Sequence, residues 1–146
     1  MTYAVLFPGQ GSQSVGMGSD VFAARPDLLV DQADQILGWS LSELCASGPE
    51  EELTRTDRAQ PALYAVAYAL WEAWRDQAPP PVAAAGHSLG EYTALAAAGA
   101  VGFGAGLVLV AARGWALAAA AAAGSGGMAA LLGGEAEDAE ALAAAR

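Results

Sequence analysis

The pentapeptide GHSLG, Gly86 to Gly90, contains the side chain with the clearest chemical potential in this sequence. Ser88 lies between the two glycines in a G-x-S-x-G pattern, after a short apolar run and before a helical pattern. In a nucleophile elbow of this kind, the serine occupies a tight strand-to-helix turn and the glycines let the strand and helix pass closely. The N–H of Leu89 would face the same space at the helix start, where it favours negative charge. We predict that Ser88 is a catalytic nucleophile, the alternative being a tight packing turn.

Two other side chains bear on this chemistry. A free serine hydroxyl is a weak nucleophile that needs a base. His87 is the one histidine of the chain, but consecutive side chains at a strand end diverge, so we expect a structural role for it beside the site. Arg113 stands alone in an apolar run, and its guanidinium presents a rigid fork of donors that suits a carboxylate. The alternative is that Arg113 pairs with a structural acid or reaches solvent.

Strands alternating with helices would position these residues. Apolar, β-rich runs predict buried strands at Tyr3–Phe7 and at 82–85, each followed by a glycine-containing loop. Helical spacing predicts helices over 60–77, 91–100 and 103–123. This order indicates an α/β fold with a mainly parallel sheet, whose ligand sites lie at the carboxyl ends of the strands. The loops PGQGSQ and GHSLG both follow such ends.

The boundaries of these elements carry further expectations. Gln60 and Pro61 are predicted to open the helix over 60–77, so that end-capping or exposure would explain the glutamine. Gly99 is placed to end the helix over 91–100. The segment MAALLGG, 128–134, predicts another strand, and the helix after it is expected to be still running at Arg146.

Composition excludes several classes of function. The 146 residues include six arginines, no lysine and 16 acidic residues, and the net charge of −10 argues against nucleic acid as a partner. Cys45 is the lone cysteine, and we expect it to be an inert packing residue. We predict neither a metal site nor a signal peptide, and hence a cytoplasmic location. The segment 105–123 could cross a bilayer by length, but the central Arg113 favours a buried helix of a soluble protein and no membrane partner.

Several stretches together resemble a known family. They are LFPGQGSQSVGMG (Leu6 to Gly18), QPAL (Gln60 to Leu63), GHSLGEYTALAAAGA (Gly86 to Ala100) and the Arg-Gly pair at Arg113. This chain is similar over most of its length to the malonyl-CoA:acyl carrier protein transacylases and the acyltransferase domains of fatty acid and polyketide synthesis. The resemblance implies malonyl transfer, expected to serve fatty acid biosynthesis, from a coenzyme A thioester to the phosphopantetheine thiol of an acyl carrier protein. It implies no permanently bound cofactor.

The resemblance also assigns roles to residues. Ser88 would carry the malonyl group, the backbone N–H groups of Gln10 and Leu89 would form the oxyanion hole, and Arg113 would bind the malonyl carboxylate. Gln60 and His87 would be active-site neighbours.

The chain departs from the family pattern in length. Family members are about twice as long and carry their catalytic histidine in the second half, so this sequence is expected to be truncated and to transfer malonyl groups poorly by itself. The alternative explanation of its length is a split enzyme, in which a second polypeptide supplies the histidine. We expect residues 1–126 to form the first part of the large, hydrolase-like subdomain and 127–146 the beginning of a small ferredoxin-like subdomain. The alternatives are a serine thioesterase or esterase of the α/β-hydrolase type, and an inactive truncated binding module.

Overall fold

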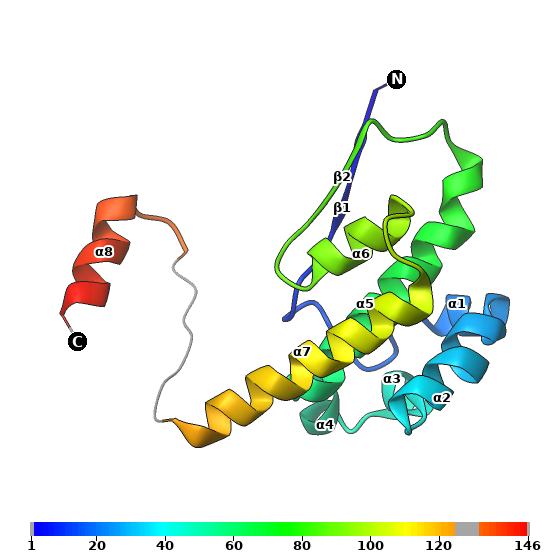
Figure 1. The fold of residues 1–146 in the computed structure, drawn as a ribbon, viewed down its shortest axis with the longest axis horizontal. Helices are drawn as coiled ribbons and strands as arrows, with labels where there is room; N and C mark the ends of the chain where they lie inside the picture. Colours follow the sequence, from blue (N-terminus) through cyan, green and yellow to red (C-terminus); the bar gives the residue numbers. More distant parts are fainter. Residues whose placement is uncertain (1, 125–131, 146) are drawn as a thin grey trace.

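Alternating apolar runs and helical patterns give a mixed helical and parallel-sheet architecture in the computed structural model, which describes residues 2–124 and 132–145 (Figure 1). Its elements are β1 (Ala4–Phe7), α1 (Ser19–Ala24), the π-helix η1 (Asp27–Gln32), α2 (Ala33–Leu37), α3 (Leu41–Ser47), α4 (Glu50–Thr54), α5 (Thr56–Trp74), the 3-10 helix η2 (Arg75–Gln77), β2 (Ala83–Gly86), α6 (Gly90–Ala97), α7 (Phe103–Ala123) and α8 (Ala136–Ala144). The predicted alternation of strands and helices is therefore confirmed in the described residues.

The sheet pairs β1 with β2 in parallel, with Ala4 opposite Ala83 and Phe7 opposite Gly86. Both predicted strands form, but the expectation that they are buried is wrong for most of their length. Phe7 is buried and its ring meets Trp71 edge-on at 6.4 Å, whereas Leu6 is 77% exposed. Successive side chains of a strand point to opposite faces. Phe7 therefore faces the helices, and Leu6 faces the side that no described element covers.

The predicted start of α5 at Gln60 is wrong. The helix begins at Thr56, so Pro61 lies inside it rather than in the first turn. Proline cannot donate the bond that a helical N–H makes to the carbonyl four residues earlier, which here belongs to Asp57. Gln60 is 1% exposed, so neither end-capping nor simple exposure explains it.

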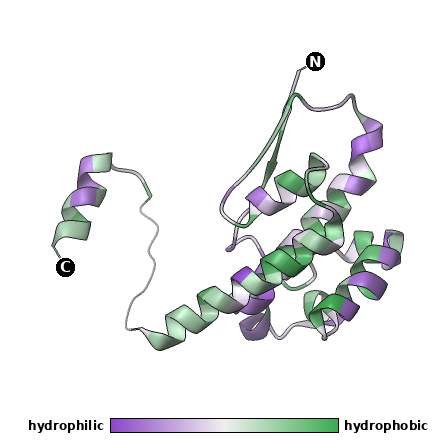
Figure 2. Cartoon of the chain, viewed as in Figure 1, coloured by the Kyte–Doolittle hydropathy of each residue, from purple (hydrophilic) through white to green (hydrophobic). Residues whose placement is uncertain are grey.

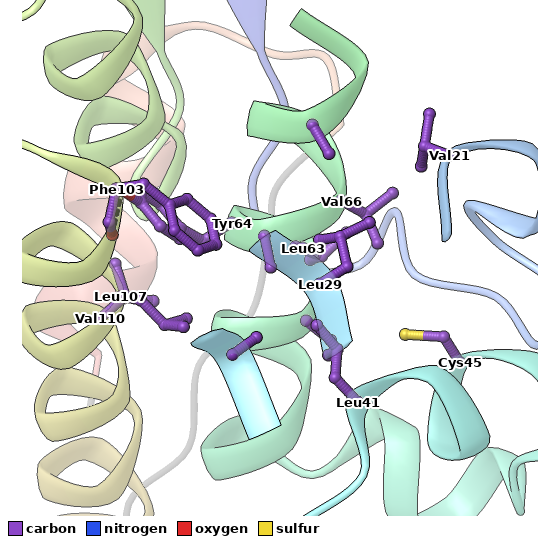
Figure 3. Packing of buried hydrophobic residues seen from close by; sticks show 14 of the residues in the cluster. Val21, Leu29, Leu41, Cys45, Leu63, Tyr64, Val66, Phe103, Leu107 and Val110 are labelled. Atoms are coloured by element: carbon purple, nitrogen blue, oxygen red, sulfur yellow. Dashed lines mark hydrogen bonds between the residues drawn. The ribbon is translucent and has the colours of Figure 1, made fainter. Parts of the chain in front are cut away.

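The hydrophobic core surrounds α5, with the short helices on one side and α7 on the other (Figure 3). Tyr64 of α5 is fully buried, and its hydroxyl donates a 3.0 Å hydrogen bond to the carbonyl of Phe103 at the start of α7. The two rings stack with centroids 5.6 Å apart. A Cβ added at Gly106 would lie 2.1 Å from the Tyr64 hydroxyl, so the glycine permits this close helix contact.

Helix α7 confirms the predicted range 103–123, but it has no buried residue after Gly114. Its buried residues are Phe103, Gly106, Leu107, Val110 and Gly114. Trp115, one residue further, is 70% exposed, and Figure 2 shows that apolar residues dominate the whole helix. Among the described residues this is the one helix long and apolar enough to cross a membrane. An 18-residue stretch of it has a mean hydropathy of 1.7, and 22% of that stretch is buried. Core helices of soluble proteins meet the same criteria of length and composition.

One other predicted boundary is confirmed and two are not. Gly99 follows the C-cap residue Ala98 of α6 and has a φ of 75°, as predicted for the glycine that ends a helix. Most of the predicted strand at 128–134 lies outside the described residues, and its last three residues, 132–134, are not in a strand. Helix α8 ends at Ala144, whereas the sequence predicted a helix that continues to Arg146.

Candidate active site

Ser88 lies on a sharp turn between β2 and α6. Its φ of 54° makes it the sole residue other than glycine with a positive φ in the described part of the chain. That conformation costs an L-residue about 1–2 kcal/mol. The flanking glycines are required by space, because a Cβ on Gly86 would lie 1.9 Å from the carbonyl carbon of Gly90, and one on Gly90 would lie 2.4 Å from the carbonyl oxygen of Phe7. The glycines thus serve the close strand-helix approach that the sequence predicted.

Arg113 reaches this turn from α7. One terminal guanidinium nitrogen donates a 2.8 Å hydrogen bond to Oγ of Ser88. The adjacent Gly114 is buried, and a Cβ there would lie 2.9 Å from the carbonyl oxygen of Thr56, so α7 can lie directly on α5 at this point. In the described residues Arg113 forms no ion pair with a carboxylate, so the alternative that it pairs with a structural acid has no support there.

Gln60 connects Arg113 to the loop after β1. The second terminal nitrogen of Arg113 donates a 2.5 Å hydrogen bond to Oε1 of Gln60. The amide nitrogen of Gln60 donates in turn to Oε1 of Gln10 at 3.3 Å, and the Gln10 amide donates to the Thr56 hydroxyl at 3.1 Å. Sequence reasoning included Gln60 only as a neighbour and missed the side chains of Gln10 and Thr56. The available signal was a glutamine within an apolar helical run.

His87 does not contact Ser88 through a hydrogen bond in the described structure. Its ring lies instead against the loop after β1, since a Cβ on Gly9 would come within 2.6 Å of His87 Nδ1. The His87 N–H donates to the carbonyl of Phe7 at 3.1 Å and extends the pairing of β2 with β1. This arrangement favours the structural role that the sequence predicted for His87.

The backbone N–H groups of Gln10 and Leu89 come from the two loops that meet here. Neither donates a hydrogen bond to another described residue. Leu89 directly precedes α6, so its N–H lies at the positive end of the helix dipole. Their role as oxyanion donors stays a prediction.

The assembled site combines the hydroxyl of the exposed Ser88, the guanidinium of the half-buried Arg113 and the amide of the buried Gln60. The described residues contain no group of histidine, cysteine or acidic side chains able to hold a metal ion. A cavity of about 330 Å³ lies elsewhere, lined by Trp71, Val82 and neighbouring residues at the opposite end of β2. The chemistry that this site supports is nucleophilic attack by a serine beside a fork of donors for an anion.

The site therefore consists of a serine on a strand-to-helix turn of a parallel sheet and an arginine from a later helix, which is an arrangement suited to acyl transfer through a serine. The chain belongs to the acyl transferase domain family, which matches residues 4–144. It is 47% identical over 136 residues to the malonyl CoA-acyl carrier protein transacylase of Bacillus subtilis, an alignment that covers 92% of this chain and 43% of the relative. The chain thus spans less than half of that relative.

Solved structures agree with this assignment. The malonyl-CoA:ACP transacylase of Synechocystis sp. PCC 6803 superposes with a TM-score of 0.77 at 47% identity, covering 82% of this chain and 41% of the other. A malonyl-transacylase solved in complex with a type II polyketide acyl-carrier protein, PlMCAT:AntF, superposes with a TM-score of 0.72 at 43% identity over 79% of this chain and 38% of the other.

Proposed function

We propose that this chain carries the nucleophile and the carboxylate-binding half of a malonyl-transfer site. Ser88, on a nucleophile elbow, takes the malonyl group from malonyl-CoA and passes it to the phosphopantetheine thiol of an acyl carrier protein. The relatives named for malonyl transfer support this substrate and this acceptor. A solved relative in complex with a carrier protein supports the partner.

The proposed transfer has two chemical steps. Oγ of Ser88 attacks the thioester carbonyl carbon, the C–S bond breaks, and coenzyme A leaves as the thiol with the proton that the serine gives up. The thiol of the carrier protein then attacks the carbonyl carbon of the serine ester, a new C–S bond forms, the ester C–O bond breaks, and the proton of the thiol returns to Oγ of Ser88. The negative charge that develops on the carbonyl oxygen in each step is held by the N–H groups of Gln10 and Leu89. We do not propose His87 as the base that takes the proton of Ser88, because the His87 ring lies against Gly9.

The observation that carries this proposal is the 2.8 Å contact between Arg113 and Ser88. A malonyl thioester has a carboxylate on the carbon next to its reacting carbonyl. Its two ends therefore need a cation and a nucleophile close together, and a plain acyl ester needs only the nucleophile. The contact favours transfer of a carboxylated acyl group over the activity of a general esterase.

Intact-protein mass spectrometry after incubation with malonyl-CoA tests the proposal. We expect a malonyl adduct that peptide mapping places on Ser88 and that the Ser88→Ala variant lacks. Transfer of the adduct to a carrier protein bearing phosphopantetheine would complete the reaction, whereas release of free malonate with no labelled carrier would indicate a hydrolase. Absence of any adduct on Ser88 would contradict the proposal and favour the alternative of a binding module.

A further inference from the structure

The Gln60 side chain has no role in the transfer steps proposed above, although it lies beside Arg113. It is a polar side chain with 1% exposure inside the apolar helix α5. A buried amide of this kind is costly unless both its oxygen and its nitrogen are hydrogen-bonded. Here the oxygen accepts from Arg113 at 2.5 Å and the nitrogen donates to Gln10 at 3.3 Å.

These bonds restrict the guanidinium. An arginine side chain has several rotatable bonds and a planar head with five N–H donors. One donor is directed to Gln60 and another to Ser88, so the plane of the head is fixed by two acceptors from different elements. Three donors remain for an incoming carboxylate. Without Gln60, the Ser88 hydroxyl would be the one described side chain that orients Arg113.

We propose that Gln60 is a positioning residue that determines selectivity for a carboxylated acyl group. This inference rests on the proposed function of Arg113 as the carboxylate receptor. Gln60 does not touch the reacting atoms; it holds the fork of Arg113 at the correct distance from Ser88. Through Gln10 it also links that fork to the loop that supplies one oxyanion N–H.

The same geometry predicts a split between substrates. Malonyl-CoA depends on the orientation of Arg113, whereas acetyl-CoA has no carboxylate and does not. Loss of a hydrogen bond to a charged group typically costs enough to change a rate or binding constant by about 10- to 100-fold. We therefore expect Gln60→Leu to lower the rate constant for malonyl acylation of Ser88 at limiting substrate by that factor. Acetyl acylation should change by no more than about threefold.

Gln60→Glu separates orientation from charge. The glutamate oxygen can still accept from Arg113, so the guanidinium stays in place. Its negative charge, however, pairs with the guanidinium of Arg113, which is the group that the malonyl carboxylate would otherwise bind. We expect Gln60→Glu to lose selectivity for malonyl-CoA as strongly as Gln60→Leu does.

The experiment measures adduct formation on Ser88 of this protein with malonyl-CoA and with acetyl-CoA. The matched control is Gln77→Leu, since Gln77 is an exposed residue at the far end of the same helical segment, and its side chain bonds only the carbonyl of Ala73 among the described residues. A second readout is the side-chain ¹H–¹⁵N NMR signal of Arg113, assigned by its absence in Arg113→Lys. This signal should be sharp in the wild type and in Gln60→Glu, and broadened in Gln60→Leu.

The outcomes distinguish the two proposals. A malonyl-to-acetyl ratio in Gln60→Leu equal to that of the control would overturn the role of Gln60 and leave the proposed function intact. If the wild type forms no adduct, the proposed function fails, and the NMR signals still decide whether Gln60 orients Arg113. An unchanged Arg113 signal in Gln60→Leu would then overturn the positioning role itself.

Discussion

Arg113 is the residue on which substrate choice should depend most directly. Its two terminal nitrogens already bond Ser88 and Gln60, at 2.8 and 2.5 Å. Lysine would keep the positive charge but supplies a compact ammonium in place of a planar fork. It could not bond both acceptors and grip a carboxylate in the same geometry.

We therefore expect Arg113→Lys to reduce malonyl acylation of Ser88 by about 10- to 100-fold, with a smaller effect on acetyl acylation. Competition between the two thioesters, followed by mass spectrometry of the Ser88 peptide, measures the ratio. Arg75→Lys is the matched control, because Arg75 is 46% exposed and pairs with Glu72 away from the site. Equal losses for both thioesters would show that Arg113 does not recognise the carboxylate.

Ser88 combines a reactive position with a strained backbone. At a φ of 54° glycine has no steric penalty, whereas alanine keeps the penalty and loses the hydroxyl. Both variants should form no acyl adduct. In urea unfolding, Ser88→Gly should be more stable than Ser88→Ala by about 1 kcal/mol. Equal stabilities would show that the turn is not strained at Ser88 in solution.

Residues whose geometry depends on a local pattern could be placed from the sequence. Ser88 and its two glycines form a turn whose requirements lie within five consecutive residues, and Arg113 was a charge isolated in an apolar run. The network around Gln60 could not be predicted in the same way. Its partners Gln10 and Arg113 lie 50 and 53 residues away in the chain, so the contacts depend on how α5 packs against α7 and the β1 loop.

At the scale of elements, the contact between α5 and α7 sets the distance from Arg113 to the site. Gly106 lies directly against Tyr64, whose hydroxyl bonds the carbonyl of Phe103 at 3.0 Å. An added methyl group would lie 2.1 Å from that hydroxyl oxygen and 2.7 Å from the ring carbon that carries it. Either the helices separate or the tyrosine moves and its hydrogen bond is lost.

Gly106→Ala is therefore expected to destabilise the fold by about 1–3 kcal/mol, even though alanine is the better helix former. Chemical denaturation measures the change. Gly102→Ala is the control, because a Cβ there meets nothing within 4 Å and the change should cost less than about 1 kcal/mol. A stabilised Gly106→Ala protein would mean that the two helices do not touch at this point.

The elements themselves were predictable to different degrees. Helical spacing gave α7 its bounds, because its apolar run begins after Gly102 and continues to the glycines that follow Ala123. The start of α5 was missed because Pro61 was assigned to a first turn, whereas the helix begins at Thr56 and accommodates the proline inside. Local sequence rules describe preferences for positions, and packing against α7 outweighs such a preference here.

At the scale of the whole molecule, burial was the property that the sequence predicted least well. Leu6 and Val82 of the sheet region are 77% and 71% exposed, and Trp115 of α7 is 70% exposed. An apolar run indicates a surface that favours burial, but its burial depends on what packs over it. The described helices cover the side of the sheet where Phe7 lies and leave Leu6 open.

Burial inside the core has a consequence for stability at alkaline pH. Cys45 is fully buried, and burial raises its pKa from 9.0 to about 12. Burial also raises the pKa of Tyr64 above its usual 10.0. Both groups stay neutral in the folded chain at a pH where the unfolded chain would already release their protons. Their contribution to stability is therefore complete below about pH 9 and is lost as the pH rises toward the folded pKa values.

The free energy of unfolding should consequently fall between about pH 9 and pH 12, by up to about 1.4 kcal/mol per pH unit for each group. Urea unfolding at several pH values in this window measures the slope. Cys45→Ala and Tyr64→Phe each remove one titrating group, so each should have a shallower slope than the wild type whatever its stability at pH 7. Slopes equal to that of the wild type would show that neither the thiol nor the phenol is shielded from water, which would contradict a core packed around α5.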